Sequence, residues 1–305
     1  MTVRHLISVD DLSDGDIRKI VARGVEFRER GAGADRPLAG RIAGIYFGKT
    51  STRTRTAFTA GTLRLGGQVI PLGPGDLQTN TGESIEDTAR VLGRMLDVFV
   101  MRTAGDPAEM RTFAEEDRMA VINAMSATEH PTQALTDITT LLWRFGGVEG
   151  LRILYVGEGN NTASALALAL SRYPSARLEL RTPPGYGLAD DILARVDPEV
   201  VTERHDMDDL PKGVNVVYTT RWQTTGTTKP DANWREIFAP FQVTTALWED
   251  SPQAVFMHDL PAHRGEEVTP EVIDGKHSIA FDQAENKLHS AMAVLEWCRV
   301  EDGGR

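Results

Sequence analysis

This sequence contains little cysteine and has fewer positive than negative charges. The single cysteine, Cys298, cannot form an internal disulfide or a multi-cysteine metal site, and its apolar helical surroundings favour a packing role. The 33 lysines and arginines are outnumbered by 44 aspartates and glutamates, which gives a formal net charge of −11. This balance argues against nucleic acid or an anionic membrane as the main partner, so any anion-binding site must be local.

Long apolar runs are absent as well. No stretch approaches the roughly 20 apolar residues that a membrane-spanning helix needs, and residues 1–12 lack the apolar core of a signal peptide. We therefore expect a cytoplasmic protein with no membrane partner. The 305 residues, 41% apolar and 25% charged, are typical of a globular chain long enough for two domains.

Short apolar runs alternate with segments of helical period, which is typical of parallel sheets covered by helices. We predict an α/β fold with two doubly wound parallel-sheet domains joined by long helices. One domain comprises residues 1–130 plus 284–305, and the other comprises residues 131–283. Helices are expected to begin near Thr52, Ser84 and Pro107 and to span 131–145 and 284–300. The predicted strands are 41–47, 97–101, 119–123, 152–156, 177–180, 214–218 and 254–257.

Hydroxyl and guanidinium groups gather where the first predicted strand passes into a helix, in Ser51-Thr52-Arg53-Thr54-Arg55. A helix N-terminus offers unpaired N–H groups and a partial positive charge, so this segment predicts a phosphate site that needs no glycine-rich loop. The alternative is an ordinary N-cap followed by solvated arginines. Arg102 supports the phosphate site because it follows a buried strand, at the sheet edge where open α/β folds bind ligands.

A second polar group, His130-Pro131-Thr132-Gln133, opens the long helix. Proline at the first helical position fixes the entry of the chain, and His130 and Gln133 are expected to face the same crevice. A structural cap is the alternative for His130. A helix N-terminus disfavours a charged imidazole, so a functional His130 is expected to be neutral and to donate one hydrogen bond to a carbonyl oxygen.

These motifs, taken in order along the chain, resemble the aspartate and ornithine carbamoyltransferases, and several segments are closest to the ornithine branch. The resemblance extends from about residue 5 to residue 298. Its motifs are Phe47-x-x-x-Ser51-Thr52-Arg53-Thr54-Arg55, Glu83-Ser84-x-x-Asp87-Thr88-Ala89-Arg90, Met101-Arg102-Thr103, His130-Pro131-Thr132-Gln133, His258-x-Leu260-Pro261, Arg264-Gly265-Glu266-Glu267-Val268 and Ala284-Glu285-Asn286-x-x-His289.

The resemblance implies an enzyme that transfers the carbamoyl group of carbamoyl phosphate to an amine of an amino acid and releases phosphate, with no metal or organic cofactor. It assigns catalytic roles in polarising the carbonyl to Arg102, His130 and Thr54. It assigns the accepting of hydrogen bonds from the carbamoyl amide to Gln133 and the backbone carbonyl of Leu260. The implied carbamoyl phosphate site comprises Ser51, Thr52, Arg53, Thr54, Arg102, His130, Gln133, Leu260 and Lys287, with Gln78 from a neighbouring subunit.

Family members are homotrimers in which a loop of the neighbouring subunit completes each site, and residues 75–81 with Gln78 match that loop, although an ordinary polar loop is the alternative. Lys287 stands where the family usually has arginine after Glu-Asn. Lysine keeps the charge but lacks the bidentate fork, so we expect carbamoyl phosphate to be held less rigidly.

The acceptor side departs from the ornithine branch. Thr220 stands in place of an aspartate, and Asp259 stands in place of a cysteine between the histidine and leucine of the later motif. In contrast, Thr220-Arg221-Trp222-Gln223 resembles the aspartate branch, and Asn161 matches an asparagine that contacts the amino-acid end of ornithine. The implied acceptor-binding residues are Asn161, Thr220, Arg221, Gln223, Thr224, Thr225 and Asp259.

These departures lead to a hypothesis in which Asp259 pairs with the acceptor's ammonium, and Arg221 or Asn161 with its carboxylate. A diamino acid shorter than ornithine, such as 2,3-diaminopropionate, is one candidate. The alternative is that Asp259 only relocates the missing carboxylate and ornithine still binds. The sequence leaves both open.

Three other functions compete with carbamoyl transfer. An NADP-dependent oxidoreductase could use Gly157-x-Gly159 and Arg181, but Thr162 replaces the third glycine of the fingerprint. A metal site at His258 and His263 lacks the usual ligand spacing. A catalytically silent relative that binds a metabolite is the third alternative.

Overall fold

The computed structural model describes residues 3–34, 36–103, 105–224 and 227–298. The chain divides into two compact units, Met1–Thr139 with Asn286–Arg305, and Thr140–Glu285. We call them the first and the second unit. The two divisions fall within the helices α5 (Pro131–Phe145) and α10 (Ala280–Trp297). The predicted domain limits, 1–130 plus 284–305 and 131–283, stay a prediction.

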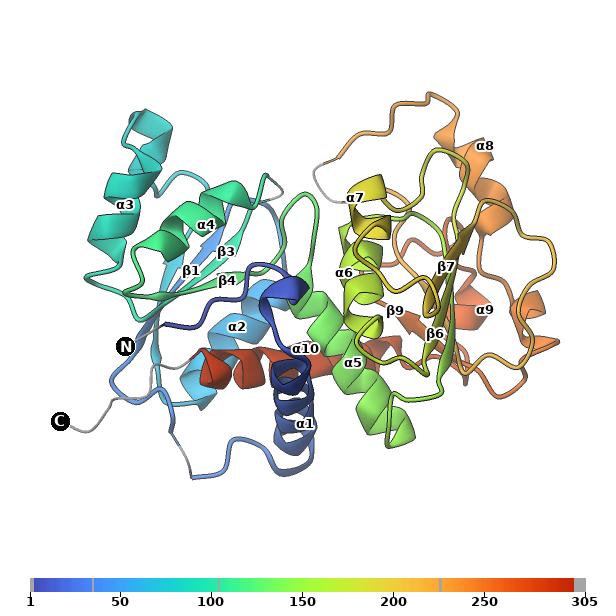
Figure 1. The fold of residues 1–305 in the computed structure, drawn as a ribbon, viewed down its shortest axis with the longest axis horizontal. Helices are drawn as coiled ribbons and strands as arrows, with labels where there is room; N and C mark the ends of the chain where they lie inside the picture. Colours follow the sequence, from blue (N-terminus) through green and yellow to red (C-terminus); the bar gives the residue numbers. More distant parts are fainter. Residues whose placement is uncertain (1–2, 35, 104, 225–226, 299–305) are drawn as a thin grey trace. The chain divides into compact units, whose positions relative to one another are not determined.

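The first unit contains a parallel four-stranded sheet in the order β2-β1-β3-β4 (Figure 1). Every residue of β3 and β4 is buried, as expected of apolar runs covered on both faces. Phe99, Phe113 and Val121 belong to the core that this sheet shares with its helices. The strands are β1 (Ile42–Phe47), β2 (Gln68–Leu72), β3 (Val98–Arg102) and β4 (Ala120–Asn123).

The helices of the first unit begin and end at recognisable signals. Ser13 accepts a hydrogen bond from the backbone N–H of Asp16 in a capping box that starts α1. Gly61 brings α2 close to α10, because a Cβ atom there would lie 3.1 Å from Cγ of Met292. Besides the start of α5 and most of α10, the elements are α1 (Asp14–Arg30), α2 (Arg53–Arg64), α3 (Ile85–Leu92), α4 (Ala108–Glu115) and the 3-10 turns η1 (Val9–Asp11) and η2 (Gln78–Thr81).

The second unit contains a parallel five-stranded sheet in the order β7-β6-β5-β8-β9. Its strands are β5 (Arg152–Val156), β6 (Arg177–Arg181), β7 (Val201–Arg204), β8 (Val216–Thr219) and β9 (Val255–His258). The central helix α6 is buried along its whole length. The helical elements are α6 (Asn161–Leu170), α7 (Asp190–Leu193), α8 (Trp234–Phe238), α9 (Pro270–Ile273), η3 (Ala239–Phe241) and η4 (Thr245–Trp248).

The predicted fold class is confirmed, and the largest corrections concern sheet edges and one helix start. Two edge strands, β2 and β7, have no counterpart among the predicted strands, whereas the other two edge strands, β4 and β9, match predicted runs. The two unpredicted strands lack a buried apolar run: β2 is largely exposed and contains Pro71, and β7 alternates with charged residues. The last helix begins at Ala280, one turn before the predicted start at 284. Cys298 is buried, as its predicted packing role requires.

None of the helices within the described part of the chain combines the length and the apolar character that crossing a membrane needs.

Candidate active site

Both sheets reverse their strand order beside the segments that carry the predicted site. In the first unit the chain passes from β1 to β2 on one side, and then to β3 on the other side of β1. Ligands of open parallel sheets bind at the carboxyl ends of the strands where such a reversal occurs. The 51–54 segment follows β1, and Arg102 ends β3 opposite Phe47. The predicted phosphate site therefore lies at the reversal point of the first sheet.

The start of α2 does not use its hydroxyl groups for capping. Thr52 occupies the N-cap position, but its backbone is helical and its side chain makes no capping hydrogen bond. Thr52 therefore gives no side-chain cap, and its hydroxyl does not satisfy the first N–H groups of this 12-residue helix. Thr54 is buried, Ser51 and Arg53 are half-buried, and Arg55 is exposed.

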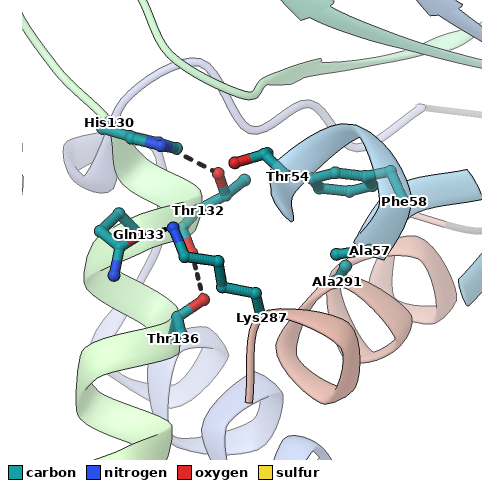
Figure 2. Close-up of a pocket in the computed structure, with 9 residues that line it drawn as sticks. All are labelled: Thr54, Ala57, Phe58, His130, Thr132, Gln133, Thr136, Lys287 and Ala291. Carbon is teal, nitrogen blue, oxygen red and sulfur yellow. Dashed lines mark hydrogen bonds between the residues drawn. The ribbon is translucent and has the colours of Figure 1, made fainter. Parts of the chain in front are cut away.

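A pocket in the first unit is lined by residues of α2, the start of α5 and α10 (Figure 2). Figure 2 shows the Lys287 side chain extending toward Gln133, while Thr54 faces the first residues of α5, next to His130. The structure thus brings together four predicted donor-site residues. The pocket is lined by Thr54, Ala57, Phe58, His130, Thr132, Gln133, Thr136, Lys287 and Ala291.

The side-chain amide of Gln133 is held at both ends. Lys287 donates a hydrogen bond from Nζ to Oε1 of Gln133, and Nε2 of Gln133 donates to Oδ1 of Asp137 at 2.7 Å. These two partners fix which end of the amide is the acceptor. The Oε1 atom retains a second lone pair, which suits the predicted acceptance of a hydrogen bond from the carbamoyl amide.

His130 is buried, and its surroundings favour the neutral form of the imidazole. Burial lowers the pKa of the His130 imidazole well below its ordinary value, and the positive charges of Lys287 and Arg102 lower it further. Its Nδ1 atom lies 3.3 Å from the hydroxyl of Thr132. The neutral imidazole agrees with the predicted state, although burial is the largest cause rather than the helix N-terminus.

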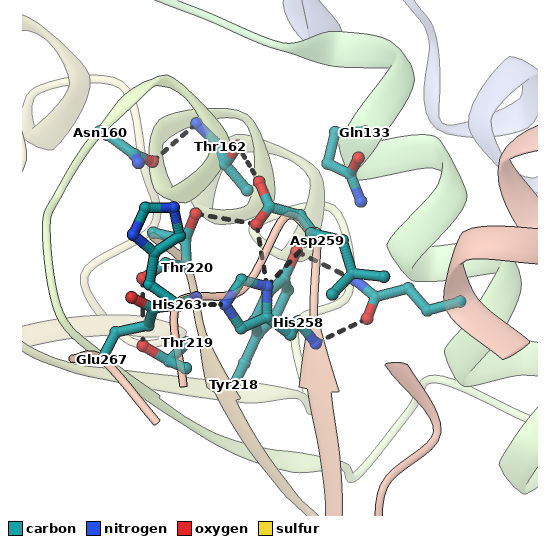
Figure 3. A network of polar contacts seen from close by, with 12 residues as sticks. Gln133, Asn160, Thr162, Tyr218, Thr219, Thr220, His258, Asp259, His263 and Glu267 are labelled. Atoms are coloured by element: carbon teal, nitrogen blue, oxygen red, sulfur yellow. Dashed lines mark hydrogen bonds and ion pairs between the residues drawn. The ribbon is translucent and has the colours of Figure 1, made fainter. Parts of the chain in front are cut away.

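The second sheet reverses between β5 and β8, and polar side chains meet beyond this point (Figure 3). Asp259 follows β9 directly, and its carboxylate accepts two hydrogen bonds, from Thr220 Oγ1 at 2.9 Å and from Thr162 Oγ1 at 3.0 Å. The Asp259 side chain is 15% exposed. The two positions that differ from the ornithine branch, Thr220 and Asp259, are therefore in direct contact.

A buried histidine holds the backbone beside Asp259. Nδ1 of His258 accepts a hydrogen bond from the backbone N–H of Leu260 at 2.8 Å. The proton of a neutral ring is therefore on Nε2, which donates to Oε1 of Glu267 at 3.1 Å. Leu260 has a positive φ of 55° and precedes a cis peptide bond to Pro261. His258 and Glu267 thus fix the direction of the backbone around Leu260.

The remaining acceptor-side residues lie on the loops that follow β5 and β8. Asn161 is the first residue of α6 and is buried. Arg221 is half-buried, and its Nε atom is buried without a hydrogen-bond partner in the described residues. Gln223 donates from Nε2 to the carbonyl of Thr227 at 2.9 Å. Thr225 lies outside the described residues.

An ion pair anchors the loop after β8, and the sequence analysis did not find it. Lys229 donates from Nζ to Oε1 of Glu158, and its side chain is 3% exposed. Thr224 Oγ1 lies 3.3 Å from Oε2 of Glu158 and accepts a hydrogen bond from Asn160 Nδ2 at 3.1 Å. Burial raises the pKa of Glu158 and lowers that of Lys229. The pair joins Lys229 to the turn before α6, and Thr224 contacts the same carboxylate.

The structure argues against the dinucleotide alternative. Arg181 is fully buried and bound by acidic partners, with 2.8 Å from Nε to Glu179 Oε1 and 2.8 Å from Nη1 to Asp206 Oδ1. It is not available for a 2′-phosphate. Gly159 is explained by packing, because a Cβ atom there would lie 2.3 Å from the carbonyl carbon of Gly187.

A metal site is not supported either. Nε2 of His258 is bonded to Glu267, and His263 is linked to Glu266 by a 3.6 Å contact. Within the described ranges, no three side chains of histidine, cysteine, aspartate or glutamate come together in a way that could hold a metal ion.

Gln78 begins η2 and is exposed. Its Oε1 atom accepts a hydrogen bond from Thr81 Oγ1 at 2.8 Å. The sequence analysis missed the roles of Asp137 in fixing Gln133 and of Thr162 in holding Asp259. Asp137 lies one helical turn after Gln133, so its spacing was a usable signal. Thr162 contacts a residue far along the chain, which no local pattern indicates.

Comparison with known proteins agrees with this geometry. A family model described as "Aspartate/ornithine carbamoyltransferase, carbamoyl-P binding domain" matches residues 4–142, and one described as "Aspartate/ornithine carbamoyltransferase, Asp/Orn binding domain" matches residues 149–298. The ornithine carbamoyltransferase of Pseudomonas syringae pv. tomato is 38% identical over 301 residues, covering 97% of each chain. That of Symbiobacterium thermophilum is 40% identical over 304 residues, covering 96% of each chain.

Solved structures agree as well. The ornithine carbamoyltransferase of Pyrococcus furiosus has a TM-score of 0.90 at 36% identity, with 96% of each chain covered. The fold and these matches thus define a transferase with two parallel-sheet α/β units. The chain belongs to the aspartate/ornithine carbamoyltransferase family, and it is a carbamoyltransferase.

Proposed function

We propose that this carbamoyltransferase transfers the carbamoyl group of carbamoyl phosphate to the side-chain amine of a diamino acid, either ornithine or a shorter one such as 2,3-diaminopropionate. The neutral side-chain amine nitrogen bonds to the carbonyl carbon, the bond from that carbon to the phosphate oxygen breaks, and the proton that the amine loses leaves with the phosphate. The products are phosphate and a ureido amino acid. The observation that carries the proposal is the fixed carboxylate of Asp259 at the end of β9.

The donor side of the proposal uses the first unit. The start of α2, with Ser51, Thr52, Arg53 and Thr54, binds the phosphate, and Lys287 adds a positive charge beside Gln133. Arg102, Thr54 and neutral His130 direct donors to the carbonyl oxygen. Negative charge grows on this oxygen as the amine attacks, so fixed donors stabilise the transition state more than the ground state. Gln133 and the Leu260 carbonyl accept from the carbamoyl amide.

The acceptor side uses the second unit. Asp259 pairs with the acceptor's ammonium group that does not react, and Arg221 with Asn161 binds the acceptor's carboxylate. The buried, unpartnered Nε of Arg221 supports this role, since a buried donor is costly unless it is paired. Thr220, Gln223, Thr224 and Thr225 complete the proposed acceptor site.

The proposal extends to assembly and location. The chain acts as a homotrimer in which Gln78 of a neighbouring subunit contacts carbamoyl phosphate; the exposure of Gln78 on η2 is compatible with this contact. Analytical ultracentrifugation would test the trimer. A cytoplasmic location is the expectation from the single, buried cysteine.

A panel of acceptor amines tests the proposal. Phosphate release from carbamoyl phosphate is measured with ornithine, 2,4-diaminobutyrate, 2,3-diaminopropionate and aspartate. We expect release that depends on a diamino acid, that is lost in Arg53→Ala and that survives in Arg64→Ala, an exposed arginine at the other end of the same helix. Preference for aspartate would refute the assigned role of Asp259. If no acceptor of the panel increased the release of phosphate, a catalytically silent relative would be favoured.

A further inference from the structure

Thr162 is a buried side chain to which the carbamoyl-transfer motifs assign no role. We infer that Thr162 is a positioning residue that, together with Thr220, fixes the Asp259 carboxylate for the ammonium group of a diamino-acid acceptor. This inference rests on the function proposed above, and it names the device that gives the acceptor site its preference.

The sheet register explains why these side chains meet. Thr219 of β8 lies opposite His258 of β9, so the next residues, Thr220 and Asp259, leave the sheet side by side. Val156 of β5 lies opposite Thr219, which brings the turn before α6 to the same edge. The N-cap residue Asn160 accepts from the backbone N–H of Thr162 at 3.0 Å. Three separate segments thus converge on one carboxylate.

The two hydroxyl groups hold different oxygens of that carboxylate. Thr162 Oγ1 donates to Oδ2 at 3.0 Å, and Thr220 Oγ1 donates to Oδ1 at 2.9 Å (Figure 3). The terminal torsion of an aspartate is otherwise broad, so one donor on each oxygen restrains its rotation. A carboxylate has about four acceptor sites. The sites left over are the ones that an ammonium group with three N–H donors can use.

The charge of Asp259 has no permanent counterion among the described residues. Its one ion-pair contact is with Nδ1 of His258 at 3.5 Å, and that nitrogen accepts the backbone N–H of Leu260. No lysine or arginine of the described ranges forms an ion pair with Asp259. A carboxylate that is 15% exposed, that accepts hydrogen bonds from two hydroxyl groups and that has no lysine or arginine paired with it in the described ranges favours a cation. The geometry points to the acceptor's ammonium group as that cation.

The test compares Thr162→Val with Thr162→Ser in the full chain. Valine keeps the shape and removes the hydroxyl, whereas serine keeps the hydroxyl. Thr269→Val is the matched control, because the Thr269 hydroxyl is buried and has no hydrogen-bond partner in the described residues. KM and kcat are measured for the best diamino acid of the panel and for carbamoyl phosphate. Melting temperatures show whether each variant is folded.

We expect Thr162→Val to raise the KM of the diamino acid about tenfold, as loss of one hydrogen bond to a charged group predicts. The KM of carbamoyl phosphate should change less than twofold. Thr162→Ser should restore most of the acceptor affinity, and Thr269→Val should resemble the wild type. If Thr162→Val fails to fold, Thr220→Val is expected to give the same split between the two substrates.

Two failures are distinguishable. If the wild type carbamoylates diamino acids but Thr162→Val leaves their KM unchanged, or raises both KM values equally, the positioning role is overturned while the proposed function stands. If the wild type shows no preference for an acceptor with a second ammonium group, the proposed function and this inference are both overturned.

Discussion

Replacing Lys287 by methionine should weaken the binding of carbamoyl phosphate strongly. The ammonium group donates to Gln133 Oε1 inside the first unit, and Lys287 is 8% exposed, so little water screens its charge. Methionine has a similar length and removes the charge. A hydrogen bond to a charged group contributes about 1.5–3 kcal/mol, and each 1.4 kcal/mol corresponds to a tenfold change in affinity. We expect the KM of carbamoyl phosphate to rise about 10- to 100-fold.

The same variant should change the titration of a second residue. The positive charge of Lys287 is the second cause, after burial, that lowers the pKa of His130. Without that charge the pKa of His130 should rise, although burial and Arg102 still hold it below the ordinary value. NMR titration of the imidazole measures this shift. Both effects come from one charge, so they should appear together.

Two control variants separate this contact from a general loss of charge. Lys287→Arg keeps the charge and restores the fork, so donor affinity should be at least that of the wild type. Lys276→Met removes an exposed lysine and should leave both readouts unchanged. An unchanged KM for carbamoyl phosphate in Lys287→Met would refute the assigned contact.

Three further outcomes follow from buried groups. The pKa of His130 is lowered in the folded state, so below about pH 6.5 the unfolded chain binds a proton that the folded chain does not. The free energy of unfolding should therefore fall as the pH drops below that value, by at most about 1.4 kcal/mol per pH unit. Urea unfolding of His130→Gln should show a weaker dependence on pH. Lys229→Met should lower the free energy of unfolding by about 3–5 kcal/mol because it leaves the Glu158 carboxylate without its counterion. Adding Glu158→Gln should recover most of this loss, whereas additive effects of the two substitutions would contradict the pairing. Burial raises the pKa of the Cys298 thiol, so iodoacetamide should modify Cys298 only in the unfolded chain, and rapid native labelling would be inconsistent with its burial.

The sequence predicted the buried strands well, including the edge strands β4 and β9, but it did not indicate the two more exposed edge strands, β2 and β7. The runs that became β3 and β4 are continuous and apolar because both faces of those strands are buried. In β2 the alternation of apolar and polar residues is broken by Pro71, and the strand is largely exposed, so few of its side chains need to be apolar. Without β2 and β7, neither reversal of strand order could be located from the sequence.

The same difference applies to the site. The hydroxyls and guanidinium groups at the start of α2 are contiguous in sequence, so one helix end gathers them without help from the rest of the fold. The prediction of a neutral His130 rests on the adjacent helix end, but the main cause that lowers the pKa of this histidine is burial, which local sequence does not indicate.

The sequence by itself determined the features that depend on neighbours along the chain: the α/β pattern, the cluster of hydroxyl and guanidinium groups at the start of α2, and the single buried cysteine, Cys298. Only the tertiary structure decided how the acceptor side is built. In the sequence, Asp259 has no evident partner among its neighbours. The parallel register of β8 and β9 places it beside Thr220, and the chain after β5 brings Thr162 to the same carboxylate. Strand order and register bring together residues that are distant in sequence, so the partners of that carboxylate could not be derived from local pattern.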